Sequence, residues 1–180
     1  MSPFTIAIAN QQRAVRINRR QLTRLARSVL ARETVASADI SIAIVDDRQI
    51  HAINRQFLKH DYPTDVISFL LDGAFEETSA CGRAGRVGAK PTGKGRGRGR
   101  ALRTNRRGRG KVIDGEVILS AETARRNAGI FGVSPNEELS LYLVHGLLHL
   151  CGYDDMTRPE KQLMRRREAE SLGRTATRRT

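Results

Sequence analysis

The chain has 180 residues, a length that suits one domain, and its 32 Lys and Arg against 19 Asp and Glu give a net charge of +13. It contains no stretch of about 18 apolar residues, and its N-terminus lacks the charged start and long apolar segment of a signal peptide. Two cysteines are too few for a disulfide framework. We therefore expect a cytoplasmic protein without membrane contact, and the positive charge favours a polyanionic partner such as nucleic acid.

The excess charge lies in two segments that have little apolar material to bury. Residues 73–111 hold 12 Lys or Arg, 2 Glu and 10 of the 16 glycines. This composition predicts a disordered, Gly/Arg-rich insertion. Residues 173–180 form a short basic tail. We predict one domain over residues 1–172, with the insertion inside it and a foldable part that is neutral overall.

Hydrophobic periodicity and capping residues predict about four strands and five helices. In chain order these are a strand at 4–8, a helix at 19–30, a strand at 40–44, a short helix that carries Ile50, Ile53 and Phe57, strands at 66–71 and 112–119, and helices at 121–128, 135–150 and 158–172. The expected capping residues are Asn18, Asp46 or Asp47, Ser120, Ser134 and Thr157. The mixed order predicts an α+β domain, in which helices cover a small mixed four-stranded sheet and the insertion joins two neighbouring strands.

The stretch HGLLHLCGYDD, which begins at His145, has the pattern of a metal site. His145 and His149 share one helix face, with Cβ atoms about 6 Å apart, so both imidazoles can bind one Zn²⁺. Gly152 can end the helix in the left-handed conformation, so that Asp154 or Asp155 supplies a third ligand. Three protein ligands and an open fourth position are typical of catalytic zinc. The alternative is a pair of core histidines that hydrogen-bond to their neighbours.

Two further residues of this stretch narrow the interpretation. Zinc proteases of the H-E-x-x-H type use the Glu after the first His as general base, and here that position is Gly146. A metzincin-like metallopeptidase therefore stays only as an alternative. Cys151 lies two residues past the second histidine, on the other side of the helix, and we expect it to be a buried, small apolar residue.

Three segments occur together in a recognisable order. HGLLHLCGYDD resembles the pattern H-G-x-L-H-L-x-G-Y-D-H, and NRQFLKHDYPTDVISF, residues 54–69, resembles N-x-x-[YF]-x-x-x-[HK]-D-x-x-T-D-V-[LI]-S-F. GEVILS, residues 115–120, is similar to G-D-I-x-I-S. The chain thereby resembles the YbeY family, the metal-dependent endoribonucleases of ribosomal RNA maturation.

This resemblance implies a set of metal ligands and marks two departures. The family's ligand positions fall on His145, His149 and Asp155, and most members have a third His where this chain has Asp155. We expect one Zn²⁺ per chain, with Mn²⁺ or another divalent ion as an option because a carboxylate favours harder ions. Many members carry an Arg linked to activity where this chain has Leu58. No catalytic side chain is assigned.

The resemblance also implies a function. We expect a single-strand-specific endoribonuclease that acts in maturation of the 16S ribosomal RNA 3′ end and in ribosome quality control. Its partners would be single-stranded or ribosomal RNA and the small ribosomal subunit with its proteins. Leu58 and Asp155 favour one alternative, a ribosome assembly factor that does not cut RNA. Arg55, Lys59 and His60 are candidates for phosphate contacts, or else a solvated helix end.

Overall fold

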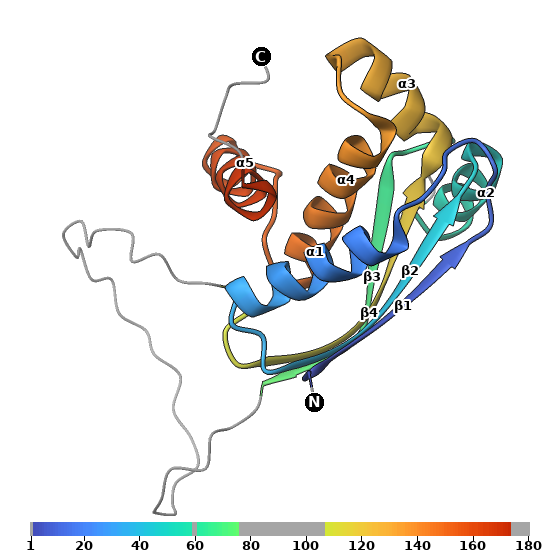
Figure 1. Ribbon diagram of the computed structural model, residues 1–180. Helices are drawn as coiled ribbons and strands as arrows, with labels where there is room; N and C mark the ends of the chain where they lie inside the picture. Colours follow the sequence, from blue (N-terminus) through green and yellow to red (C-terminus); the bar gives the residue numbers. More distant parts are fainter. Residues whose placement is uncertain (1, 59–60, 76–106, 174–180) are drawn as a thin grey trace, which may run out of the picture.

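The residues that the structure describes form a four-stranded mixed sheet with five α-helices (Figure 1). The computed structural model describes residues 2–58, 61–75 and 107–173. The elements are β1 (Phe4–Asn10), α1 (Arg19–Arg32), β2 (Ser37–Val45), α2 (Asp47–Ile53), a π-helical turn (Asn54–Leu58), β3 (Val66–Phe75), β4 (Lys111–Ser120), α3 (Ala121–Phe131), α4 (Pro135–Leu150) and α5 (Arg158–Leu172). The predicted α+β class is confirmed.

The strands lie in the order β1-β2-β4-β3. β1, β2 and β4 run parallel, and β3 pairs antiparallel with β4, so that β1 and β3 form the two edges. A register shift between Leu70 and Asp72 interrupts the β3–β4 ladder. Such a bulge bends the strand locally.

The helices begin at the predicted capping residues. The side chain of Asn18 accepts a hydrogen bond from the Gln21 amide, and Ser134 and Thr157 each form a capping box. At the start of α2 the cap is Asp46, since its side chain accepts from the Gln49 amide. Asp47 is instead the first residue of that helix.

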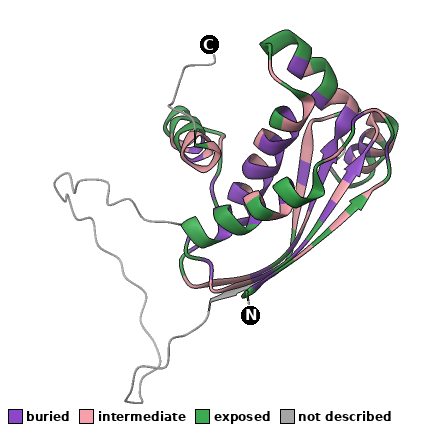
Figure 2. Ribbon diagram, in the orientation of Figure 1, coloured by how far each residue is buried: buried purple, intermediate pink, exposed green. Residues whose placement is uncertain are grey.

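The two faces of the sheet are covered unequally. α1 and α4 pack on one face, and the short α2 packs on the other. α4 is buried on nearly all sides, and Figure 2 shows it in purple between the sheet and the other helices. The fully buried large side chains of the main core include Leu22, Leu30, Ile40, Ile42, Ile44, Leu119, Leu139, Leu143, Leu147 and Leu148. Because α4 is buried, the points on the helix from which its side chains project are fixed.

The predicted insertion is shorter at its ends than its composition indicated. Residues 73–75 pair with residues 111–113 and extend the β3–β4 ladder, because backbone pairing does not depend on an apolar side-chain pattern. The Gly110 amide donates to Thr34 O at 3.0 Å, which attaches the residues before β4 to the end of α1. Residues 76–106, with Cys81, and the tail 174–180 lie outside the described residues. Within the described part of the chain, no helix has both the length and the apolar character needed to span a membrane.

Candidate metal centre

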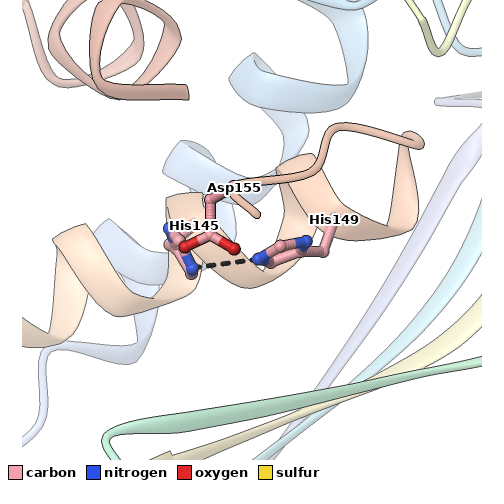
Figure 3. Close-up of side chains that lie close together, drawn as sticks. All are labelled: His145, His149 and Asp155. Atoms are coloured by element: carbon pink, nitrogen blue, oxygen red, sulfur yellow. Dashed lines mark hydrogen bonds between the residues drawn. The ribbon is translucent and has the colours of Figure 1, made fainter. Parts of the chain in front are cut away.

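His145 and His149 project from consecutive turns of α4 toward the same point (Figure 3). Their Nε2 atoms lie 3.0 Å apart, and the rings meet edge to face with centroids 4.6 Å apart. Asp155 comes from the chain after the helix, and one ligand atom from each of the three residues lies within 4.8 Å of the others. The structure therefore brings together the three residues that the resemblance indicated.

The return of the chain after α4 depends on one glycine. Gly152 has φ of +93°, and its amide donates to His149 O at 2.8 Å, which closes the end of the helix. A Cβ at this position would lie 2.8 Å from Lys111 Nζ. Past the turn, the exposed Asp154 accepts a hydrogen bond from the Asp155 amide at 2.8 Å, and it is Asp155 that joins the histidines.

Both histidines use Nδ1 for an outer hydrogen bond. His145 Nδ1 lies 2.7 Å from Glu168 Oε1 on α5, and His149 Nδ1 lies 3.0 Å from the carbonyl oxygen of Tyr153. Since each Nδ1 faces an acceptor, each Nε2 is left to face the cluster. Sequence reasoning missed Glu168, because a residue 23 positions away on another helix leaves no local signal.

The two rings differ in their affinity for protons. Burial of His145 lowers its pKa, but the hydrogen bond and the charge of Glu168 outweigh this effect, and the net pKa is above the ordinary value. Burial and the neighbouring His145 hold the pKa of His149 below the ordinary value. A neutral His149 that donates from Nδ1 presents its Nε2 lone pair to the cluster.

The cluster opens into a cleft of about 470 Å³ between α4 and the edge strand β3. The cleft is lined by Thr64, Asp65, Val66, Ile67, Ser68, Leu70, His145, Gly146, His149 and Leu150. Asp65 accepts hydrogen bonds from the Val66 amide at 2.9 Å and from the Thr64 hydroxyl at 3.1 Å. These bonds fix the loop before β3.

Gly146 allows α4 to pack closely on the sheet. A Cβ at this position would lie 2.8 Å from Val117 Cγ1 and 3.1 Å from Val66 Cγ2. The protease pattern requires Glu at this position, and here even a methyl group collides with the sheet.

Two cations, one from the first residue of β4 and one from the turn before it, hold the end of α4. Lys111 Nζ donates to Cys151 O at 3.0 Å, and Arg107 donates from its guanidinium to Gly152 O at 2.8 Å. Positive charge at a helix C-terminus is favourable because the last carbonyl groups have no partner within the helix. Cys151 itself is fully buried, as predicted.

The other residues that the sequence analysis singled out lie away from the cleft or outside the described residues. Leu58 ends the π-helical turn, and Lys59 and His60 are outside the described residues. Arg55 is exposed and lines a second hollow of about 470 Å³, not the cleft beside the histidines. The second hollow is lined by Arg48, His51, Ala52, Arg55 and Gln56.

The donor set fits a divalent cation. Ligands at about 2.1 Å from a tetrahedral Zn²⁺ lie about 3.4 Å from one another. The Nε2 atoms of His145 and His149 are 3.0 Å apart, and the carboxylate of Asp155 lies within 4.8 Å of both. Small side-chain movements would therefore let all three residues hold one ion, beside the cleft that His145 and His149 line.

Known proteins agree with the motifs and the fold. The family described as Endoribonuclease YbeY matches residues 7–176. A relative named Endoribonuclease YbeY from Pelotomaculum thermopropionicum is 36% identical over 154 residues, which cover 85% of this chain and 83% of the relative. Another of that name, from Syntrophotalea carbinolica, is 33% identical and is covered over 94% of both chains.

A solved structure supports the fold alone. The solution structure of a protein from Thermotoga maritima superposes with a TM-score of 0.51 at 19% identity, over 94% of this chain and 90% of that one. The family match extends over almost the whole chain and includes the three residues that converge beside the cleft. The chain belongs to the YbeY endoribonuclease family.

Proposed function

We propose that this protein is a metal-dependent endoribonuclease that hydrolyses single-stranded RNA, with His145, His149 and Asp155 as ligands of one Zn²⁺. The observation that carries the proposal is the convergence of these three side chains at an open cleft in a chain of the YbeY family. The carboxylate of Asp155 also makes Mn²⁺ or another hard divalent ion acceptable.

The roles of the chain's own residues follow from their contacts. A bound divalent ion would polarise a phosphoryl oxygen and activate water. Glu168 and the Tyr153 carbonyl hold the two imidazoles with Nε2 toward the ion. Leu70 and the β3 edge form the opposite wall, against which a strand of RNA would lie.

The first experiment compares cleavage of single-stranded RNA by the wild type and by His145→Ala and His149→Ala. His51→Ala is the matched control, since His51 lies on α2 and contacts Asp61 rather than the cluster. We expect about one metal ion per chain and RNA cleavage in the wild type and the control, and loss of both in the two test variants. Equal cleavage by all four proteins would refute the metal site.

We further propose that the substrate is ribosomal RNA at the 3′ end of the 16S precursor, cleaved during maturation and ribosome quality control. The partners would be the small ribosomal subunit and its proteins, in the cytoplasm. Family membership supports this assignment. Purified protein should shorten the precursor in isolated small subunits, and His149→Ala should not. Cleavage of free RNA without cleavage of the precursor would limit the proposal to the nuclease activity.

A second candidate is a ribosome assembly factor that binds RNA without cutting it. It is favoured by Leu58 at the position where many family members have Arg, and by Asp155 in place of a third His. Stoichiometric metal binding without cleavage at any ratio of protein to RNA would select this candidate. The peptidase alternative has no support from the packing of Gly146 against Val117.

A further inference from the structure

α1 and the segment before it carry an exposed group of arginines that the metal centre does not use. This arginine surface consists of Arg13, Arg16, Arg19, Arg20, Arg24, Arg27 and Arg32, all of them exposed (Figure 2 shows the outer side of α1 in green). Residues 11–32 contain no Asp or Glu. Among the described residues, none of these seven side chains forms an ion pair. The foldable part is neutral in sum, and seven of its 17 basic residues belong to this surface.

The arginines in the first half of α1 do not stabilise the helix. Arg19 and Arg20 occupy the first turn, at the positive end of the helix dipole, and that turn has no acidic residue. Arg20 and Arg24 are four residues apart, a spacing at which like charges destabilise a helix. Departures from locally favourable sequence are expected at functional sites.

The spacing suits a polyphosphate. Arg20, Arg24 and Arg27 follow one another at single-turn intervals along the outer side of α1, so their guanidinium groups form a row over about 10 Å. Each guanidinium can donate two parallel hydrogen bonds to one phosphate. A row of such groups fits a chain of phosphates better than a single anion.

The buried side of α1 argues for RNA over a lipid surface. Helices that lie on membranes insert an apolar face between the lipids. In α1 the apolar residues Leu22, Ala26, Val29 and Leu30 are at most 1% exposed, because they pack in the core. The exposed side therefore offers charge without an apolar face.

We propose that the arginine surface binds the phosphate backbone of RNA at a distance from the metal cleft. α1 packs beside the edge strand β1, and the cleft lies at the opposite edge, beside β3. Three strand spacings of about 4.8 Å separate these edges, roughly 14 Å in all. The arginine surface thus holds a part of the RNA that flanks the segment in the cleft. The choice of RNA as the partner rests on the proposed function.

The test is a salt series of RNA binding by the full chain, measured with a chelator present so that no strand is cut. The test variant replaces Arg20, Arg24 and Arg27 by Gln. The control is a triple variant with the same change in net charge, in which three exposed arginines elsewhere are replaced: Arg48→Gln, Arg125→Gln and Arg165→Gln. We expect the slope of log K against log salt to become shallower by about 2 in the test variant, and by much less in the control.

Three results would overturn the inference. If the salt slope falls equally in the two triple variants, net charge alone explains the weaker binding. If the slope of the test variant equals that of the wild type, the arginine surface does not bind RNA. Loss of binding to anionic lipid vesicles with RNA binding intact would assign the surface to membranes. A small phosphodiester, bis(p-nitrophenyl) phosphate, separates the two proposals: its hydrolysis reports the metal centre alone and should be the same in the wild type and the test variant. Absence of RNA cleavage by the wild type with added metal, together with weakened RNA binding in the test variant, would remove the proposed function and leave the inference standing.

Discussion

Glu168 Oε1 lies 2.7 Å from His145 Nδ1, so a carboxylate on α5 orients a ring on α4. Both side chains are mostly shielded from solvent, with 16% and 26% of their surfaces exposed. Such outer carboxylates fix the tautomer of a metal-binding histidine and raise its basicity as a ligand. The contact also ties α5 to the site, although α5 supplies no ligand.

We predict that Glu168→Gln weakens metal binding about 10-fold and Glu168→Ala up to about 100-fold, since the ring loses its oriented partner. Competition with a fluorescent chelator measures the dissociation constant directly. Glu170→Gln is the matched control, because Glu170 is two residues away and bonds to Arg167 instead. Equal affinities in the wild type and both Glu168 variants would show that Glu168 has no part in the site.

Gly146→Ala should destabilise the fold by about 1–3 kcal/mol, because its Cβ would lie 2.8 Å from Val117 Cγ1 in a packed interface. The same change at Gly129, in α3, meets no atom within 4 Å and should stabilise by up to about 1 kcal/mol through helix propensity. Urea unfolding of both variants measures the difference. Two changes of the same sign and size would contradict the packing described for Gly146.

Asp47 links α2 to α3, and its contribution to stability should depend on pH. Burial alone would raise its pKa, but hydrogen bonds from Ser120, Thr123 and Arg126 hold it below the ordinary value. A lowered folded-state pKa stabilises the protein above the unfolded-state pKa of about 3.9, and the stabilisation is lost as the pH falls through the folded value.

Asp47→Asn should therefore lower the free energy of unfolding by about 1–2 kcal/mol at pH 7, and the difference from the wild type should shrink toward pH 3. Urea titrations at pH 7, 5 and 3 measure this trend. Asp39→Asn, an exposed position on β2, should change the unfolding free energy by less than about 0.5 kcal/mol. A penalty for Asp47→Asn that is constant over the whole range would rule out the ionised carboxylate as its origin.

Cys151 should not react with alkylating reagents in the folded protein. Burial, with the nearby charge of Glu33, raises the pKa of its thiol to about 12, and the side chain is fully buried. Since the thiolate is the reactive form, iodoacetamide at pH 8 should label Cys151 only after unfolding. Peptide mapping distinguishes Cys151 from Cys81. Rapid labelling of Cys151 under native conditions would contradict the packing at the end of α4.

Features of the fold and the site that depend on the spacing of nearby residues could be predicted from the sequence. The caps at Ser134 and Thr157, and the pair His145 and His149, are short-range patterns that follow from helix geometry. Glu168 was not predictable, because its contact joins residues 23 positions apart through the packing of α4 on α5. The contact of Lys111 with Cys151 O was hidden for the same reason, and also because Lys111 belonged by composition to the basic insertion.

Deletion of residues 76–106 should weaken RNA binding and flatten its salt dependence, while fold and metal content stay unchanged. This segment contains nine Lys or Arg and two Glu. Because Phe75 pairs with Lys111, the deletion leaves residues 107–110 as a four-residue hairpin loop, a common length. It also keeps Arg107 and Lys111, whose contacts hold the end of α4.

A second variant separates charge from length. In it, a Gly/Ser segment of equal length replaces residues 76–106, and fluorescence anisotropy with single-stranded RNA at several salt concentrations compares it with the deletion and the wild type. If the basic side chains bind phosphates, both variants should lose affinity and show the same shallower salt slope. Wild-type affinity in the Gly/Ser variant would make the segment a spacer, and wild-type affinity in both would leave it without a role in RNA binding.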